Sequence, residues 1–355
     1  MSFDRLQQEV IKGMEGKNTG IPMGFDRLNN YIGIRKSIST LVGGLTGSGK
    51  TSFVDDAFVL NPHDYAISEI GKKNNVKVKF WYRSMERNTT YKYAKWICRK
   101  IFIEQGIIID VESLLSWRYK LSKDNHDLFL MYKDYIKELE EAVTMFDGPE
   151  NPVGIAKDLQ KYALTKGKIE QLDEYNKIYI PNDPNEINIV VIDHIGLLKT
   201  TKDLPTKKQA IDKLSNELRY ARDMFGFSPV MISQFNRSIS NPTRLKNNDV
   251  EPQLDDFKDS SSPCEDSDVV LALFDPARYK VEDPSKYNID KLRDEKGSNC
   301  FRSVRLLKNS YGADDVRVGL GFFGQIGMFK ELKKQKFMTD SDYESVTNKS
   351  WFLRQ

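Results

Sequence analysis

Residues 39–53 read STLVGGLTGSGKTSF, an apolar, β-prone run that leads directly into Gly44-Leu45-Thr46-Gly47-Ser48-Gly49-Lys50-Thr51. The spacing G-x-x-x-x-G-K-[ST] is that of a P-loop, whose glycines let the backbone wrap a phosphate chain so that successive N–H groups face the anion. The motif stands after a predicted strand and before a helix-compatible segment, residues 51–60, as this mechanism requires. It predicts a nucleotide-phosphate site; the alternative is a glycine-rich surface turn.

The P-loop assigns specific roles to its side chains. Lys50 is expected to reach the β- and γ-phosphates of ATP, and the Thr51 hydroxyl is expected to hold Mg²⁺. The predicted cofactors are therefore ATP and Mg²⁺. The residues expected to bind them are Gly44, Gly47, Ser48, Gly49, Lys50, Thr51 and Ser52.

The composition of the chain is that of a globular protein without a large net charge. The chain has 355 residues, of which 39% are hydrophobic and 30% charged, and its formal net charge is only +3. This composition fits a globular fold with ample core. So small a net charge creates no global basic field, and any nucleic-acid contact must come from local clusters.

Other features exclude further classes. No apolar run approaches the roughly 18 residues that span a bilayer, and the first residues do not begin a signal peptide. We therefore expect a cytoplasmic protein with no membrane partner. The 3 cysteines and 3 histidines are scattered, which argues against a disulfide framework or a zinc site. Mg²⁺ on the nucleotide is the only metal expected.

Apolar runs alternate with helix-like segments along the chain. Continuous apolar runs are typical of a parallel sheet covered on both faces. We therefore predict an α/β fold with a mainly parallel central sheet flanked by helices. Strands are predicted at residues 38–44, 76–82, 187–192, 229–233, 268–274, 303–308 and 316–323, and helices at residues 89–103, 207–225 and along the amphipathic run 124–145.

The two ends of the chain are predicted to differ from this central part. Residues 1–18 form a short linker helix and tether, with Phe3, Leu6, Val10 and Met14 on one helical stripe. Such a stripe usually marks an interface; the alternative is that it folds back on its own domain. Residues 19–335 are expected to be the ATPase domain, and residues 336–355 a polar, solvated C-terminal tail.

Three predicted strands end in side chains suited to nucleotide chemistry. In INIVVIDHIG (187–196), Asp193 ends a predicted strand beside the P-loop strand, where a Walker-B aspartate helps to hold Mg²⁺, partly through water. In FWYRSMER (80–87), Glu86 ends a second predicted strand and is a candidate general base; the alternative is a solvated acid. Gln234 can sense the γ-phosphate and pass the change to residues 238–263, and a loop of this length is usually functional or disordered.

Taken in order, these motifs resemble the C-terminal ATPase domain of DnaB-type replicative helicases, members of the RecA-like superfamily. The resemblance covers residues 19–329 and implies a RecA-like P-loop NTPase fold. The matching stretches are TGIPMGFDRL (19–28), the P-loop, SME (84–86), Asp193, SQFNR (233–237), LDDFKDS (254–260), EDSDVV (265–270) and KN (308–309).

The resemblance implies a ring-forming, ATP-driven translocase on single-stranded DNA, with a hexamer as the expected homo-oligomer. A primase or helicase loader is the candidate protein partner, and a phage or mobile element a plausible source. DNA contacts are expected after Asp193 and Gln234; for each cation the alternative is ordinary solvation. The candidates are Lys199, Lys202, Lys207, Lys208, Arg237, Arg244 and Lys246.

The chain departs from the family pattern at three places. The family's separate N-terminal helical domain is not expected here, and Ile34-Arg35-Lys36-Ser37 replaces a glycine-bearing turn. Ser310 replaces the arginine of the family's K-x-R finger, which begins at Lys308. This loss favours an ATPase that switches assembly without processive unwinding. A third alternative is a structural or regulatory P-loop protein that binds nucleotide and barely hydrolyses it, but Glu86 and Gln234 argue against it.

A hairpin offers a substitute for the missing finger. Tyr311-Gly312-Ala313-Asp314 is typical of a two-residue type II′ turn. If Tyr311 pairs with Asp314, Lys308 lies opposite Arg317, and cross-strand partners share a face. Arg317 is then predicted to act beside Lys308 on a neighbouring subunit's γ-phosphate. The alternative is that Arg317 is solvated and Lys308 acts alone.

Overall fold

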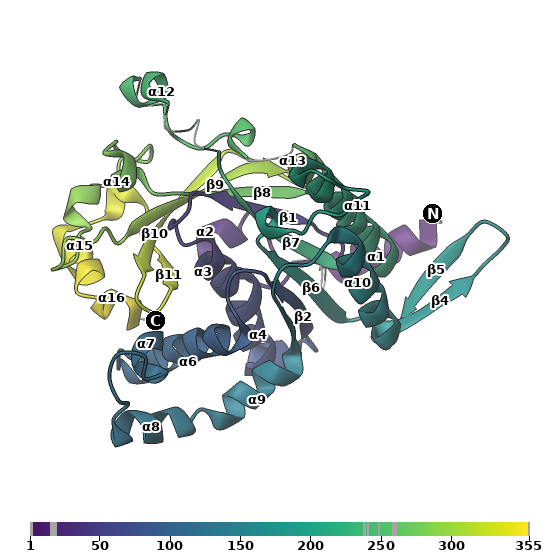
Figure 1. Ribbon diagram of the computed structural model, residues 1–355, viewed down its shortest axis with the longest axis horizontal. Coiled ribbons are helices and arrows are strands. Elements are labelled where there is room, and N and C mark those ends of the chain that lie inside the picture. The colour runs from purple at the N-terminus through teal and green to yellow at the C-terminus, as the bar shows by residue number, and fades with distance from the viewer. Residues whose placement is uncertain are drawn as a thin grey trace.

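The computed structural model describes residues 3–14, 20–236, 239, 241–247, 249–257 and 261–353. Its centre is a nine-stranded sheet in the order β11-β10-β9-β8-β1-β7-β6-β2-β3 (Figure 1). The strands of this sheet are β1 (Thr40–Gly44), β2 (Lys77–Ser84), β3 (Val143–Asp147), β6 (Glu186–Asp193), β7 (Ser228–Gln234), β8 (Val269–Phe274), β9 (Phe301–Asn309), β10 (Val316–Phe323) and β11 (Met328–Glu331).

The sheet is mainly parallel, as predicted. Strands β8, β1, β7, β6, β2 and β3 run parallel to one another, and β9, β10 and β11 extend the sheet with antiparallel pairs. One detail of the prediction is wrong, because β6, which ends in Asp193, does not lie beside the P-loop strand β1. Strand β7 lies between them.

Helices cover both faces of the sheet (Figure 1). On one face α3, η1, α6 and α9 contribute to the core, and on the other face α10 and α11 do so. The helices are α1 (Phe3–Met14), α2 (Asp26–Asn29), α3 (Lys50–Asp55), α4 (Asn61–Ile67), α5 (Glu69–Lys73), α6 (Thr89–Gln105), α7 (Val111–Leu114), α8 (Lys123–Leu130), α9 (Lys133–Ala142), α10 (Pro152–Lys166), α11 (Lys207–Phe225), α12 (Pro242–Lys246), α13 (Ser262–Asp266), α14 (Pro276–Tyr279), α15 (Asp340–Thr347) and α16 (Ser350–Leu353). Short turns are η1 (Asp56–Leu60, π-helical) and the 3₁₀ turns η2 (Ile195–Leu197), η4 (Leu254–Asp256), η5 (Ile289–Lys291) and η6 (Gln335–Phe337).

The region between α6 and β6 differs most from the prediction. The run 124–145 forms α8 and α9 and then the edge strand β3, in which Val143 pairs with Phe80 of β2. Strands β4 (Gly167–Gln171) and β5 (Lys177–Pro181) form a separate hairpin that projects from the body (Figure 1). The sequence did not predict β3, because Val143 continues the apolar periodicity of the preceding helix.

The C-terminal segment is not the solvated tail that we predicted. Helices α15 and α16 pack on the rest of the fold, with Tyr343, Val346 and Phe352 buried in a cluster that includes residues of α6 and β10. The Phe352 ring lies 5.8 Å from the ring of Phe323. These apolar side chains recur at helical spacing among charged neighbours. The charged residues led us to predict a solvated tail, and the apolar face that packs was therefore missed.

The N-terminal helix is present as predicted. Helix α1 lies within the predicted segment 1–18, and its apolar side chains are exposed, with Phe3 75% and Met14 84% accessible. Leu6 and Val10 are also exposed. The tether at residues 15–19 lies outside the described residues. Within the described structure, the apolar stripe of α1 is therefore available for contact.

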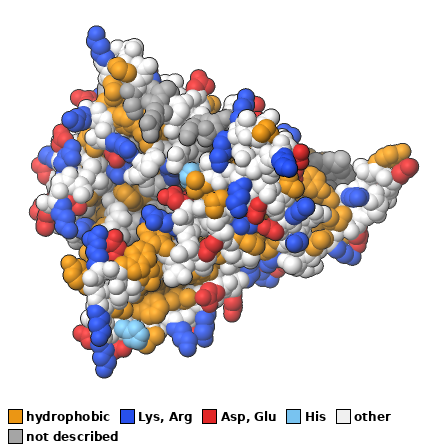
Figure 2. Space-filling model, viewed as in Figure 1, with side chains coloured by type: hydrophobic (Ala, Val, Ile, Leu, Met, Phe, Trp, Pro, Cys, Tyr) orange, Lys and Arg blue, Asp and Glu red, His pale blue; other side chains and the backbone are white. Residues whose placement is uncertain are grey.

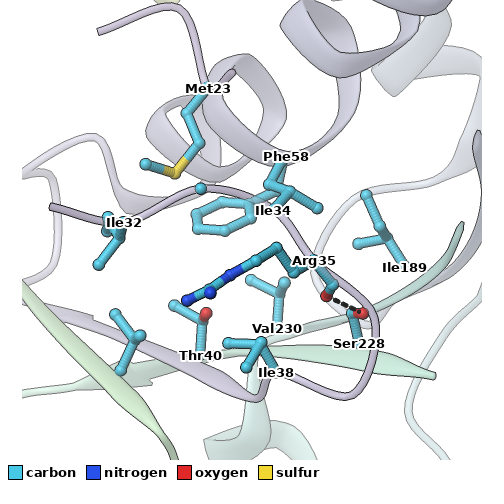
Figure 3. Close-up of a pocket in the computed structure, with 12 residues that line it drawn as sticks. Met23, Ile32, Ile34, Arg35, Ile38, Thr40, Phe58, Ile189, Ser228 and Val230 are labelled. Atoms are coloured by element: carbon cyan, nitrogen blue, oxygen red, sulfur yellow. Dashed lines mark hydrogen bonds between the residues drawn. The ribbon is translucent and has the colours of Figure 1, made fainter. Parts of the chain in front are cut away.

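A small apolar pocket lies at the edge of the sheet opposite the P-loop (Figure 3). It is lined by Thr40 and Ser228, the first residues of β1 and β7, and the Arg35 side chain extends across it. Arg35 belongs to the turn that replaces the family's glycine-bearing one. Ser37 adopts the left-handed conformation there, with φ 57°, and the Ser228 hydroxyl donates to the Arg35 carbonyl at 2.7 Å.

The surface is mixed in charge. Basic and acidic side chains are interspersed over the face seen in Figure 2, and apolar side chains gather on its lower part. Among the described residues, no helix is both long enough and apolar enough to cross a membrane. The absence of a single-sign field on this face agrees with the low net charge, so nucleic-acid contacts must depend on local groups of cations.

Candidate nucleotide and DNA site

The P-loop connects β1 to α3 at the carboxyl edge of the parallel strands. Gly47 and Gly49 have φ of 79° and 96°, a backbone region that side chains other than glycine rarely adopt. A Cβ atom on Gly49 would also lie 2.9 Å from the Phe329 ring. Both glycines are therefore required for the loop to turn into the helix.

Lys50 and Ser48 present buried polar groups to this loop. The Lys50 ammonium donates to the Leu45 carbonyl at 2.8 Å, and burial lowers the pKa of Lys50 to about 8, against the opposing effect of Asp193. The buried Ser48 hydroxyl has no hydrogen-bond partner among the described residues. A buried cation and an orphaned hydroxyl beside this glycine-rich loop fit the oxygens of a nucleotide phosphate.

Thr51 and Asp193 meet beside the P-loop. The Thr51 hydroxyl donates to Asp193 Oδ1 at 3.0 Å, although the two residues are far apart in the sequence. Mg²⁺ in nucleotide sites keeps several waters and takes its other ligands from one or two protein oxygens and the substrate phosphates. This pair of oxygens fits that requirement.

A buried charge cluster behind Asp193 escaped prediction from the sequence. The Lys92 ammonium contacts Asp193 Oδ2 at 3.1 Å and Asp55 Oδ1 at 3.1 Å, and Tyr82 donates to both carboxylates. A signal was available: Lys92, Lys95 and Arg99 share one face of α6, and acids interrupt the apolar run after the P-loop. Nothing in the sequence places that basic face against the core.

Strand register brings Glu86 and Gln234 to the same edge. Ser84 pairs with Asp193, and Glu86 follows two residues later on the exposed loop before α6. Gly44 pairs with Gln234. The Gln234 amide nitrogen lies 3.3 Å from His194 Nε2, so the ends of β7 and β6 are linked directly. His194 is a second neighbour of the site that the sequence analysis did not assign.

Two arginines from segments that are distant in the sequence bind the P-loop backbone. Arg302 on β9 donates to the Ser48 carbonyl at 3.1 Å and pairs with Asp275 at 3.1 Å. Arg278 on α14 donates to the Thr46 carbonyl. Neither arginine was predicted, because nothing in their local sequence points to a loop more than 200 residues away.

Comparison with known proteins shows what this chain is similar to. Residues 163–331 match the family described as DnaB-like helicase C terminal domain. Over just under half of its length, the chain therefore resembles the motor domain of DnaB-type helicases. It is 25% identical over 278 residues to the replicative DNA helicase DnaB of Helicobacter pylori, covering 78% of this chain and 48% of that protein. A second relative, DnaB of Mycobacterium leprae, is 30% identical over 98 residues, 28% of this chain and 15% of the relative.

Solved structures support the fold assignment. A solved structure described as an ATPase domain superposes with a TM-score of 0.67 at 19% identity, covering 94% of this chain and 99% of that one. A DnaB-like replicative helicase, studied with its interactions with primase, gives 0.65 at 20% identity, covering 94% and 67%. These likenesses confirm the RecA-like fold. The chain spans about half the length, or less, of the curated DnaB relatives it matches.

The predicted DNA-binding cations differ in their surroundings. Lys199, Lys202 and Lys208 are exposed in the segment between η2 and the first turn of α11, and Lys246 is exposed at the end of α12. Lys207 donates to the Leu198 carbonyl. Arg237 lies outside the described residues.

Arg244 is engaged within its own loop. Its guanidinium pairs with both oxygens of Asp256 at 2.5 and 3.2 Å, and it also donates to the Asp249 carbonyl at 2.7 Å. The charge of the Arg244 guanidinium is therefore neutralised by Asp256, and these bonds hold together residues of the loop after Gln234. It is a poor candidate for a phosphate contact in this conformation.

The predicted finger hairpin is wrong in register. Val316 pairs with Leu306 and Arg317 with Arg305, so Arg317 does not stand opposite Lys308. No two-residue turn forms, because the Asn309 side chain bonds Tyr311 N and the Ala313 carbonyl, which opens residues 310–315 into a longer loop.

The side chains of Lys308 and Arg317, the predicted pair, also bind other groups in the structure. Arg317 binds both oxygens of Glu251 at 2.5 and 2.8 Å. The Lys308 ammonium donates to the Cys264 and Glu265 carbonyls at 3.0 and 2.8 Å. Arg317 therefore ties β10 to the loop after Gln234, and its action on a neighbouring subunit's γ-phosphate stays a prediction.

Proposed function

We propose that this protein is an ATP-driven, ring-forming helicase that moves along single-stranded DNA during DNA replication. The hydrogen bond between Thr51 and Asp193 carries the proposal, because it unites the P-loop with a Walker-B position at the edge where Glu86 and Gln234 also lie. The curated DnaB relatives are named as replicative DNA helicases, and this supports the choice of substrate and process.

Each residue at this edge has a role in the proposed hydrolysis. Lys50 would leave the Leu45 carbonyl to bind the β- and γ-phosphates. Thr51 and Asp193 would hold Mg²⁺, which when bound neutralises charge on those phosphates. Glu86 would accept a proton from the attacking water. Gln234 would respond to the γ-phosphate, and its contact with His194 connects it to the segment that bears Lys199 and Lys202.

We propose a hexamer as the working form, in the cytoplasm of the cell or of a phage-infected host. The exposed stripe of α1 would pack on a neighbouring subunit, since within the described structure its side chains stay accessible. Lys308 would be the cation offered to the neighbour's nucleotide after leaving its carbonyl partners. A primase or helicase loader is the candidate protein partner, supported by the primase named with one structural neighbour.

The alternative is a RecA-like DNA-dependent ATPase that switches assembly without processive unwinding. Ser310 stands where the family has its finger arginine, and the nearby Arg317 is held by Glu251. A site without a trans-acting arginine is expected to hydrolyse ATP slowly, since such a residue contributes about 10³–10⁵ in rate in other P-loop enzymes.

Strand displacement on a forked DNA duplex tests the proposal. We expect the wild-type protein to separate the strands with ATP and Mg²⁺, and Glu86→Gln to bind nucleotide without separating them. The assembly-switch alternative predicts DNA-stimulated hydrolysis and nucleotide-dependent assembly with the fork left intact. A protein that binds nucleotide and barely hydrolyses it would show neither activity, and would contradict both functions.

A further inference from the structure

A closed group of buried charges lies behind the Mg²⁺ side of the site. The Lys92 ammonium is 2.5 Å from the Tyr82 hydroxyl, 3.1 and 3.2 Å from the two oxygens of Asp55, and 3.1 Å from Asp193 Oδ2. The side chains of Lys92, Asp55 and Asp193 are 1%, 4% and 2% accessible. An ammonium has three donors, and here all of them face these partners.

The two oxygens of Asp193 face different partners. Oδ1 accepts from Thr51, on the side where a nucleotide-bound cation would lie, and Oδ2 accepts from Tyr82 and Lys92. Donors from β2 and α6 therefore fix the carboxylate with Oδ1 directed at Thr51. Such outer contacts commonly orient metal-binding carboxylates.

Lys92 also sets the charge that the site presents. Its ammonium lies 3.1 Å from a carboxylate oxygen of Asp55 and 3.1 Å from one of Asp193, so it is placed between two opposite charges. With Lys92 charged, the group of two carboxylates and one ammonium carries a net charge of −1 (−2 + 1). Removal of the ammonium would leave −2, and removal of the Asp55 charge would leave 0.

We infer that Lys92, with Asp55 as its counter-ion, is a positioning residue that orients Asp193 and sets the affinity of the nucleotide site for Mg²⁺. This inference rests on the proposed nucleotide-hydrolysing function. A unit charge in contact with a metal-binding carboxylate changes divalent-cation affinity by roughly tenfold or more at low effective dielectric. These three net charges, −2 without Lys92, −1 in the wild type and 0 without the Asp55 charge, form a charge series. The series predicts that Mg²⁺ binds most tightly without Lys92 and most weakly without the Asp55 charge.

The backbone of Lys92 lies close to the segment that follows Glu86. The Lys92 backbone N–H donates to the Asn88 carbonyl at 3.2 Å in the first turn of α6, and the Ser84 hydroxyl donates to the Arg87 carbonyl at 2.5 Å. Lys92 thereby links Asp193 to the loop that carries Glu86. Loss of its side chain is expected to lower turnover even where Mg²⁺ binds more tightly.

Mg²⁺ titration of the ADP complex of the full chain, followed with a fluorescent ADP derivative, tests the inference without relying on activity. We expect Lys92→Met to bind Mg²⁺ about tenfold more tightly than wild type and Asp55→Asn about tenfold more weakly. The double variant Lys92→Met with Asp55→Asn restores the net charge, so its affinity should return to within about threefold of wild type.

Lys100→Met is the matched control. Lys100 lies on the same helix but pairs with Asp64 and Glu104, away from the site, so we expect wild-type Mg²⁺ affinity. Asp55→Asn keeps the shape of its side chain and remains informative if Lys92→Met does not fold. Wild-type affinity in Asp55→Asn, or an affinity order that does not follow the charge series, would overturn the inference. Wild-type protein that binds no ADP with Mg²⁺ would instead contradict the proposed function.

Discussion

Asp283 is a buried carboxylate whose replacement should stabilise the protein. It lines a pocket between the loop after Gln234 and the segment after α14, is 1% accessible, and its Oδ1 has no hydrogen-bond partner among the described residues. Oδ2 accepts from Tyr287 N at 3.3 Å. Desolvation by burial, with a smaller contribution from Glu251, raises the pKa of Asp283 from 3.8 to about 6.

The raised pKa fixes the sign and the pH range of the effect. Above pH 6 the folded protein must keep Asp283 ionised in an unfavourable place, which lowers the free energy of unfolding by up to about 3 kcal/mol for a shift of this size. As the pH falls from 6 to 3.8, the folded state takes up the proton first and the penalty fades. Asp283→Asn should therefore stabilise at pH 8 and progressively less toward pH 4.

Urea unfolding at pH 8 and at pH 4.5 measures the difference. We expect Asp283→Asn to gain about 1–3 kcal/mol over wild type at pH 8 and under about 1 kcal/mol at pH 4.5. Asp290→Asn is the control, since Asp290 is 87% accessible, and its replacement should change stability little at either pH. A loss of stability at pH 8, or an equal gain at both pH values, would show that ionised Asp283 does not destabilise the fold.

Three further predictions concern the proposed activity. Glu86→Gln should bind ATP normally but hydrolyse it about 10²–10⁴-fold more slowly, because the amide keeps the shape without the base; normal turnover would make Glu86 a surface acid. Reversal of two exposed cations, Lys202→Glu with Lys208→Glu, should weaken binding to single strands and reduce its salt dependence by about two phosphate contacts; full affinity in a filter-binding titration would remove these positions from the interface. Deletion of residues 1–16 should weaken oligomerisation, because the apolar stripe of α1 is exposed; intact rings in sedimentation with nucleotide would count against this role.

Local patterns in the sequence predicted much of the fold and the nucleotide site. The bounds of α11 and β10 match the prediction because each is a long run with one clear period, bounded by a cap or a turn. The P-loop, Asp193 and Gln234 were found because each follows an apolar strand. Their meeting at one edge then follows from parallel pairing.

The features that failed depend on contacts between distant segments. Lys92 occupies a basic face of α6 that could have been solvated, and only the position of Asp55 and Asp193 shows why it is buried. The register of β9 and β10 depends on the Asn309 side chain, which a turn motif does not reveal. Charged residues around α15 concealed the apolar side chains that bury the C-terminal segment.

Hydrolysis of ATP at this P-loop site, in a manner that depends on DNA, underlies every role proposed above. The steady-state ATPase rate of the wild-type chain, with and without single-stranded DNA and beside Lys50→Ala, tests it. We expect a clear stimulation by DNA in the wild type and no turnover in Lys50→Ala, because phosphate charge in a dehydrated site would lose its cation. A wild-type rate that DNA does not change, or unchanged activity in Lys50→Ala, would contradict the proposed function.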